Sequence, residues 1–430
     1  MQTTVTMAQD KLDKPFWTTL VLLMFEAVLR RLQPFAQEFT KIGKNVYLVG
    51  GAVRNLLLER PVEDYDFTTD ALPEEVQGHF KRVIATGLRH GTVTVLFQGD
   101  SYEVTTFRID GDYTDGRRPD SVEFTPSLEE DLKRRDFTIN ALALDLVSGE
   151  LIDHHGGKAD LKDGVLRAIG VPGQRFDEDA LRLLRLFRFA SQLGFRIDAS
   201  TLAAVPSRRS KLASVSRERV REELAKSVAG LYPGLALAPL FEMGFLADVF
   251  APMTLKGLSS STFKRLEGLA PDLRWSVWLT LSCPKDRSQW DQALRRLTFS
   301  NADIAAFLGP AKALDLLTSS GQTLELAKPL VSVWGSRDRV ATGLAYLEAL
   351  ESEGFWIDTS GLKKELARVA SSSDPIFLSE LAVDGKDLLA AGIPTGPLVG
   401  QILRELQKVV WNNPSLNSAE TLRKLAPTLR

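Results

Sequence analysis

Residues 46–67 read VYLVGGAVRNLLLERPVEDYDF, and this stretch decides the fold. Its first four residues form an apolar run that predicts a short strand, and Gly50-Gly51 ends that strand. Residues 52–58 then predict a helix, and residues 64–67 predict a second strand. A strand, a glycine turn, a helix and a strand in this order indicate a small α/β unit.

The α/β pattern continues toward the C-terminus and then gives way to helices. Residues 92–97 and 102–107 predict further strands. After about residue 175 the strand signals fade, and later segments have helical periodicity, among them 177–193, 217–228 and 398–410. We therefore predict an α+β chain, in which an N-terminal α/β head ends near residue 147 and an all-α remainder follows.

The composition excludes several classes of protein. The 430 residues are 44% hydrophobic and 25% charged, as in an ordinary globular protein, and the formal net charge is −2. Such a chain is not a globally basic nucleic-acid binder, so any RNA site must be a local basic patch. The single cysteine, Cys283, excludes an internal disulfide and a cysteine-built zinc site, and it suits a cytoplasmic protein.

The N-terminal region contains one apolar run, residues 20–25, which is too short to span a bilayer. A secretory signal peptide is an alternative interpretation, but no small-residue cleavage site follows the run. We predict instead an amphipathic helix over about residues 16–35 and no membrane association.

Two aspartates are the first candidates for catalysis. Asp64 and Asp66 lie two residues apart, and on a strand such positions point to the same face. Two carboxylates on one face can share a divalent ion, and oxygen ligands suit Mg²⁺. An isolated Asp-x-Asp is more often a solvated acidic turn. Here the context favours a metal site, because Gly50 and Gly51 allow close approach of a phosphate and Arg54 offers a bidentate phosphate donor.

Glu103 is a candidate for a third carboxylate. It lies in the predicted strand 102–107, so it reaches the aspartates only if that strand lies beside theirs. An exposed strand glutamate without any catalytic role explains it equally well.

The two blocks 47–54 and 63–68 together resemble the signature of the class II tRNA nucleotidyltransferase and poly(A) polymerase family, within the polymerase-beta-like superfamily. The resemblance implies nucleotidyl transfer with Asp64 and Asp66 as metal ligands and with Gly50, Gly51 and Arg54 at the nucleotide. One departure is Asn55, where the family pattern usually has Asp after the arginine. This departure puts in doubt a contact that supports Arg54. It does not affect the assignment of Asp64 and Asp66 as metal ligands.

A second block, residues 134–141, reads RRDFTINA. By itself it indicates a charged turn before a helix, with Asp136 as a capping residue. It also resembles the Arg-Arg-Asp-Phe-Thr motif of the same family. That resemblance implies that Arg135 contacts the triphosphate, Asp136 the ribose, and Asn140 the nucleotide pocket.

A third block, residues 178–188, reads EDALRLLRLFR. Asp179 and Arg182 are i and i+3 in a predicted helix, and Arg185 and Arg188 continue the spacing. A solvated basic face is the alternative. Because most intervening residues are Leu, Phe or Ala, we predict a buried helix whose arginines face a partner or a cleft.

In the family that this block resembles, the corresponding helix acts as a protein template for the incoming base. The resemblance implies that Asp179 and Arg182 read the base edge, while Arg185 and Arg188 support the nucleotide or its phosphates. The chemistry agrees, because a carboxylate accepts from the exocyclic amine of C or A and a guanidinium donates to their ring acceptors. U and G present the opposite pattern at that edge.

Three segments favour CCA addition within the family. Residues 87–93 resemble the tRNA nucleotidyltransferase version of that region, and the predicted mobile loop 112–119 has the length that CC-only enzymes tend to lack. Residues 384–400 resemble the family's tail domain, which holds the elbow of tRNA. The resemblance therefore implies addition of C, C and A to tRNA from CTP and ATP, with Mg²⁺ as cofactor and no protein partner.

The same resemblance implies an elongated arrangement of four domains: a head (1–147), a neck (148–228), a body (229–310) and a tail (311–430). Candidate tRNA contacts are the basic clusters 208–211 and 217–221, although an ordinary solvated helix face explains each of them equally well. Two alternatives on the same scaffold stay open: a poly(A) polymerase and an A-only adding enzyme. A catalytically inactive RNA-binding protein is a third, against which the intact Asp64, Asp66, Arg135, Asp179 and Arg182 argue.

Overall fold

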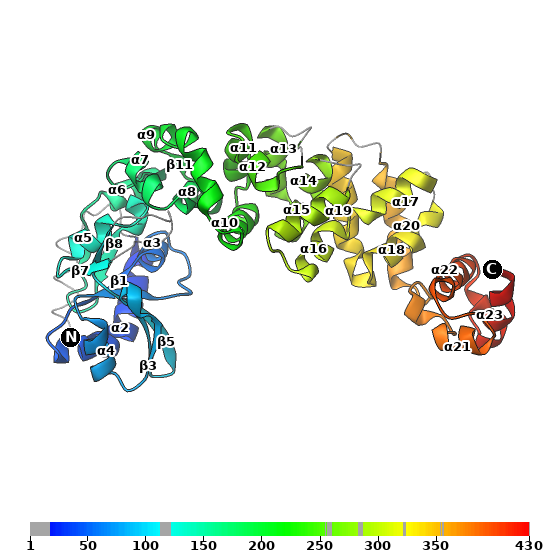
Figure 1. Ribbon diagram of the computed structural model, residues 1–430, viewed down its shortest axis with the longest axis horizontal. Helices are drawn as coiled ribbons and strands as arrows, with labels where there is room; N and C mark the ends of the chain where they lie inside the picture. The colour runs from blue at the N-terminus through cyan, green and yellow to red at the C-terminus, as the bar shows by residue number, and fades with distance from the viewer. Residues whose placement is uncertain are drawn as a thin grey trace. The chain divides into compact units, whose positions relative to one another are not determined.

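The computed structural model describes residues 18–111, 122–253, 255, 260–282, 287–320, 324–352, 354 and 357–429. The chain divides into two compact units, Met1–Phe245 and Leu246–Arg430. Figure 1 shows sheet and helices in the first unit and helices in the second. The predicted fold class, an α/β head followed by helices, is confirmed. The predicted loop 112–119 lies outside the described residues.

A seven-stranded sheet with the order β3-β4-β5-β2-β1-β8-β9 forms the centre of the head. Its neighbouring strands are antiparallel except for β2 and β5, which run parallel. The strands are β1 (Val46–Val49), β2 (Asp66–Thr69), β3 (Val83–Gly87), β4 (Thr92–Phe97), β5 (Asp100–Thr106), β8 (Leu142–Asp145) and β9 (Leu151–Asp153). Because β9 pairs with β8, the sheet continues past the head boundary that the sequence placed near residue 147.

Helix α2 (Thr19–Lys41) supplies much of the core of the head. Its Phe35 is fully buried and packs against Phe67 of β2 and Tyr102 of β5, with ring centroids 5.0 and 4.7 Å away. The helix was expected to end near residue 35, but it continues through Pro34 to Lys41. Burial of Phe39, also fully buried, outweighs the hydrogen bond that proline removes.

Shorter helices complete the head and the neck. They are α3 (Gly51–Leu57), α4 (Pro73–His79), α5 (Leu128–Lys133), α6 (Gly157–Asp163), α7 (Pro172–Glu178), α8 (Leu181–Leu193), α9 (Ala199–Ala203), α10 (Arg217–Ala229) and α11 (Gly234–Glu242). Two small ribbons join them, β6 (Arg108–Asp110) with β7 (Val122–Phe124), and β10 (Val165–Leu166) with β11 (Arg196–Ile197). Helix α8 is almost entirely buried, as its apolar sequence predicts.

The prediction of one continuous helix over residues 177–193 is wrong. Helix α7 ends at Glu178, and Asp179 has extended backbone angles, φ −137° and ψ 106°. Helix α8 then begins at Leu181, whose backbone N–H donates to Asp179 Oδ1 at 2.9 Å. An aspartate that caps a helix competes with continuation of the helix before it, so the chain turns here.

The second unit contains only helices within the described ranges. They are α12 (Phe245–Phe250), α13 (Ser260–Arg265), α14 (Pro271–Ser282), α15 (Arg287–Arg296), α16 (Asn301–Leu308), α17 (Lys312–Ser320), α18 (Ala327–Trp334), α19 (Val340–Ser352), α20 (Thr359–Ser371), α21 (Gly385–Ala390), α22 (Pro397–Asn412) and α23 (Ala419–Leu425). Buried aromatic residues pack together near its start: the rings of Phe250 and Trp290 each lie within 5.6 Å of Trp278. In the part of the chain that the structure describes, no helix has both the length and the apolar character to cross a bilayer.

Candidate nucleotide site

The site is built around the turn between β1 and α3. Gly50 has φ +68° and ψ −132°, a conformation that a residue with a side chain rarely adopts. A Cβ on Gly50 would lie 3.4 Å from Arg135 Nη1, and one on Gly51 would lie 3.5 Å from Arg54 Nη2. Two guanidinium groups therefore lie directly at the turn, and Gly50 is required by its backbone conformation rather than by a lack of space.

The carboxylates come from the neighbouring strands. Asp66 is the first residue of β2, and the strand register sets it opposite Val49 of β1 and Glu103 of β5. Asp64 is exposed and precedes the strand, which begins two residues later than the sequence predicted. Strand β5 thus lies beside β2. Glu103 could contribute to a site with the aspartates only if these strands were neighbours, and they are.

Electrostatic interactions link these carboxylates to one another and to Arg135. Loss of solvent around Asp66 raises its pKa, Arg135 opposes that shift, and Asp64 adds to it by repulsion. The pKa of Glu103 is also raised, first by burial and then by Asp66. A cation between Asp64 and Asp66 would relieve their repulsion, and Arg135 alone relieves only part of it.

The pair suits a hard divalent cation. Among the residues that the structure describes, no three His, Cys, Asp or Glu side chains lie close enough together to form a metal site. Mg²⁺ is commonly bound by one or two carboxylates, with water and substrate phosphates as the other ligands. Asp64 and Asp66 match that donor set, and Glu103 is not part of a closed group of three.

Arg54 is held by two amide oxygens. Its Nη1 donates to Asn140 Oδ1 at 2.6 Å, and its Nε and Nη2 donate to Asn55 Oδ1 at 3.2 and 3.0 Å. Asn55 replaces the usual Asp, and its amide oxygen makes the contact that supports Arg54. Burial, followed by repulsion from Arg188, lowers the pKa of Arg54 to about 10, so an anion would be bound favourably here.

Asp136 is buried and holds the guanidinium of Arg185. Its Oδ1 accepts from the backbone N–H of Phe137 at 2.8 Å and from Asn140 Nδ2 at 3.0 Å. Its Oδ2 accepts from Arg185 Nε at 2.8 Å and from Nη2 at 2.6 Å. Burial acts to raise the pKa of Asp136, but Arg185 and Asn140 lower it well below the ordinary range.

Arg188 is enclosed by protein groups. Its Nε pairs with Glu223 of α10, its Nη1 donates to Gln192 Oε1 at 2.7 Å, and its guanidinium lies 3.9 Å from the centroid of the Phe189 ring. Glu223 also lies 3.9 Å from Arg185 Nη1. The sequence did not single out Glu223 or Phe189. No local signal marks Glu223, because it lies 35 residues from Arg188, and Phe189 is one of several apolar residues of α8.

The two residues expected to read the base lie at the junction of α7 and α8. Asp179 caps α8 through Oδ1, and its Oδ2 accepts from Arg219 Nη2 at 2.9 Å. Arg182 donates through Nη1 to Glu178 Oε2 at 2.6 Å and through Nη2 to the backbone oxygen of Arg134 at 2.9 Å. Both groups are therefore fixed by neighbours, which is what a rigid reading edge requires.

The basic clusters proposed for tRNA are partly engaged within the protein. Arg219 donates to Asp179, one of the residues expected to read the base. Arg208 and Lys211 both pair with Asp177, at 3.1 and 2.8 Å, and Arg209 donates to the backbone oxygen of Met243 at 3.1 Å. Intramolecular partners leave these side chains less available to phosphate than an open basic face would be.

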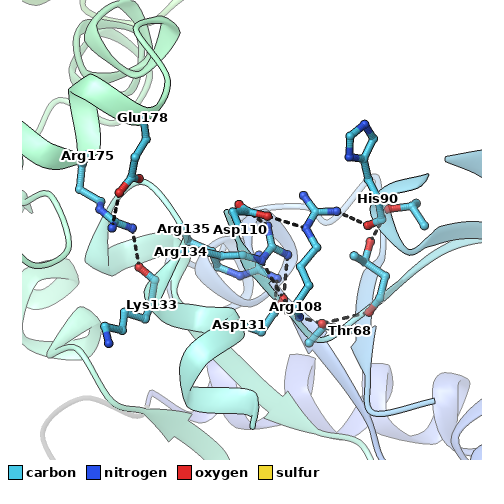
Figure 2. Close-up of polar contacts among 12 residues, drawn as sticks. Thr68, His90, Arg108, Asp110, Asp131, Lys133, Arg134, Arg135, Arg175 and Glu178 are labelled. Carbon is cyan, nitrogen blue, oxygen red and sulfur yellow. Dashed lines mark hydrogen bonds and ion pairs between the residues drawn. The ribbon is translucent and has the colours of Figure 1, made fainter. Parts of the chain in front are cut away.

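A cleft of about 740 Å³ lies beside this region. Its charged lining residues are Asp110, Glu130, Lys133, Arg134, Arg175, Asp177 and Glu178. Figure 2 shows Arg175 and Glu178 on one side, and Arg134 and Arg135 extending from the end of α5 toward Asp110 and Arg108 on the other. Because Glu178 also holds Arg182, the cleft lies directly next to the groups expected to read the base.

Comparison with known proteins identifies the relatives of this chain. Residues 46–167 match the family model described as the poly A polymerase head domain, and residues 194–257 match that described as a probable RNA and SrmB-binding site of polymerase A. A CCA-adding enzyme from Lactiplantibacillus plantarum is 39% identical over 404 residues, which cover 91% of this chain and 94% of that protein. One from Geobacillus kaustophilus is 37% identical, covering 90% and 93%.

A solved structure has a similar fold. The crystal structure of the Bacillus stearothermophilus CCA-adding enzyme in complex with CTP matches with a TM-score of 0.73 and 31% identity, covering 94% of this chain and 97% of that one. The similarity thus extends over both the head and the helical remainder.

Proposed function

Because this chain belongs to the CCA-adding enzyme family of tRNA nucleotidyltransferases, we propose that it adds C, C and A to the 3′ end of tRNA from CTP and ATP without a nucleic-acid template. One structural observation supports the proposal above the others. Arg135 lies at the Gly50 turn and interacts electrostatically with Asp66, which also interacts with Asp64, and the backbone oxygen of the neighbouring Arg134 accepts from Arg182. These contacts support one site that contains both the proposed metal ligands and the groups proposed to read the base.

Asp64 and Asp66 would hold Mg²⁺. When bound, this ion supplies activation of the tRNA 3′-hydroxyl and neutralisation of charge at the α-phosphate. Arg135, between the Gly50 turn and Asp66, would orient the triphosphate, and Arg54 would add a second positive charge at the same turn. The 3′-oxygen bonds to the α-phosphorus as the bond to the leaving pyrophosphate breaks, so no covalent enzyme intermediate is needed. Glu103, aligned with Asp66, would support the pair from the adjacent strand.

Asp179 and Arg182 would select the base. A carboxylate accepts from the amine of cytosine or adenine, and a guanidinium donates to their ring acceptors. Arg219 and Glu178 hold these two groups in place. Asp136 and Asn140 would position Arg185 and Arg54 around the nucleotide, whereas Arg188, enclosed by Glu223 and Gln192, would act through the helix rather than by touching phosphate.

We propose the four-domain division as head, neck, body and tail, with the end of the head moved beyond Asp153 so that it includes the whole sheet. Transfer RNA would bind the neck, body and tail, with its elbow at residues 384–400. We also propose a cytoplasmic location, which the proposed substrate and the single cysteine support.

The poly(A) polymerase and A-only alternatives make different products. The test is to supply a tRNA that ends at the discriminator base with CTP alone, ATP alone, or both. The proposal predicts addition of two C residues with CTP alone, almost no addition with ATP alone, and CCA with both. Addition of A directly to the discriminator base, or a tail of many A residues, would overturn it.

A further inference from the structure

We infer that Asp131 is a positioning residue for the incoming triphosphate, because it holds Arg134 and Arg135 in place behind the Asp66 and Glu103 strand pair. This inference deepens the proposed function and rests on it. Asp131 lies on α5 and is completely buried. A buried carboxylate is retained only where several donors satisfy it.

Asp131 accepts from five donors in its surroundings. Its Oδ1 accepts from Arg134 Nε at 2.9 Å, from Arg134 Nη2 at 2.7 Å and from the backbone N–H of Arg108 at 3.3 Å. Its Oδ2 accepts from Thr68 Oγ1 at 3.1 Å and from Arg135 Nη2 at 3.4 Å. Figure 2 shows Asp131 among Thr68, Arg108, Arg134 and Arg135. The carboxylate thus joins a strand, a helix end and two consecutive arginines.

The contact with Thr68 ties Asp131 to the metal pair. Thr68 follows Asp66 by two residues on β2, so the two side chains lie on the same face of the sheet. Its partner across the parallel pair is Thr105, just as the partner of Asp66 is Glu103. Thr68 Oγ1 also lies 3.1 Å from the backbone oxygen of Thr105. Asp131 is therefore anchored to the two strands that carry the candidate catalytic carboxylates.

Arg135 keeps free donors on the side away from Asp131. Only its Nη2 contacts Asp131, its Nη1 lies at the Gly50 turn, and its buried Nε has no hydrogen-bond partner within the described ranges. A buried donor without a partner is costly unless a ligand satisfies it. Burial also lowers the pKa of Arg135, and Asp131 opposes that shift and so favours the charged guanidinium. The guanidinium of Arg135 is therefore charged and has donors available to bind a phosphate.

Asp131 also reaches the residues expected to read the base, through Arg134. The side chain of Arg134 is held by Asp131, and its backbone oxygen accepts from Arg182 Nη2 at 2.9 Å. Asp131 itself contacts the side chain of Arg134 and not the backbone oxygen that meets Arg182, so its loss should act mainly on the triphosphate. The alternative is a buried ion pair that only stabilises the fold.

The number of phosphates on the ligand separates these two roles. We would measure the dissociation constants of CTP, CDP and CMP for wild type and Asp131→Asn by titration calorimetry, with Mg²⁺ and without tRNA. Asp131→Asn should weaken CTP by about tenfold or more, the size expected for loss of a charge-assisted contact, with a smaller effect on CDP and almost none on CMP. ATP should weaken with CTP, since both carry the same triphosphate.

Asp160→Asn is the matched control. Asp160 is also buried in the first unit and accepts from a threonine, Thr138 at 2.7 Å, and an arginine, Arg167 at 3.1 Å. Its substitution should lower stability without changing the ratio of CTP to CMP affinity. Equal weakening of CTP and CMP by Asp131→Asn, or no weakening of CTP, would overturn the inference.

Two further variants keep the test decisive if Asp131→Asn fails to fold. Thr68→Val removes one of the five donors with little change in shape, and it should weaken CTP more than CMP. In a background of Arg135→Ala, Asp131→Asn should add little to the loss of CTP affinity, because the two act in series. Full additivity would overturn the inference. These outcomes are distinct from failure of the proposed function, which the wild-type tRNA products decide.

Discussion

Replacing Asp179 by alanine removes two contacts with different consequences. Oδ1 caps helix α8 by accepting from the N–H of Leu181, and Oδ2 accepts from Arg219 Nη2, each at 2.9 Å. In the proposed complex the same carboxylate also accepts from the amine of the incoming base. The variant therefore tests whether Asp179 serves only the helix or also the choice of nucleotide.

The two roles differ in the quantity that they change. Loss of an N-terminal cap should reduce the free energy of unfolding by about 1 kcal/mol. Loss of the contact with the base should reduce discrimination between CTP and UTP by about 1–3 kcal/mol, which is roughly a 5- to 150-fold change in their relative incorporation. Removal of the carboxylate also ends its repulsion of the UTP carbonyl, so UTP incorporation should rise in relative terms.

Asp198→Ala is a control for the capping role. Asp198 caps α9 by accepting from the backbone N–H of Thr201 at 3.1 Å, and it pairs with Arg167. Its side chain is 15% exposed, the same fraction as that of Asp179. Asp198→Ala should therefore cause a similar loss of stability and leave the preference for C over U unchanged.

The assay has two parts, thermal unfolding of each variant and incorporation of each of the four nucleotides into a tRNA ending at the discriminator base. We expect both variants to be less stable and only Asp179→Ala to lose selectivity. If Asp179→Ala kept the full preference for C and A over U and G, the assignment of Asp179 to base reading would be refuted. Asp179 would then be a helix cap alone.

Three further predictions concern other parts of the molecule. Asp64→Asn should lower addition of C and of A by at least about a thousandfold while tRNA binding survives, because a bound metal supplies several kcal/mol of charge stabilisation; retained turnover in Mg²⁺ would contradict the assignment. The folded pKa of Asp136 lies below the ordinary value of 3.8, so the unfolded chain binds more protons in acid and the stability that Asp136 contributes is lost as pH falls. Asp136→Asn should therefore make the unfolding free energy, measured by denaturant titration, less steep in pH below about 4, and an unchanged slope would contradict this. Shortening residues 112–119, predicted from the sequence to be a loop that helps the pocket rearrange from C to A, should leave products ending in CC on a sequencing gel; equal loss of C and A addition would contradict it.

The sequence predicted the head well where local signals are strong. The apolar run 46–49 followed by Gly50 is β1 and its turn, and residues 92–97 are β4. Strand β3 (Val83–Gly87) escaped prediction because it lies at the sheet edge, where most of its side chains are exposed and no alternation of burial develops. The sequence did not predict the break between α7 and α8, because the helical periodicity of apolar residues continues through it. Only the cap made by Asp179 interrupts the helix.

The candidate site shows the same limit. The sequence proposed Asp179 and Arg182 as site residues, but their partners include Arg219 and the backbone oxygen of Arg134, which lie 40 and 48 residues away. Such partners depend on the packing of α10 against α8 and on where the residue that follows α5 lies, which no local pattern encodes. Asp131 is different, because its spacing of three and four residues from Arg134 and Arg135 is a helical ion-pair pattern that the sequence displays.

The 3′-end sequence of the product tests the central claim most directly. Purified protein would be incubated with Mg²⁺, all four nucleoside triphosphates at equal concentration, and a tRNA that ends at the discriminator base, and the products would then be sequenced. Protein-directed selection through Asp179 and Arg182 predicts that almost every product ends in CCA and that addition stops there. Products that contain U or G, that carry A without the preceding C residues, or that extend into a long tail would contradict the account.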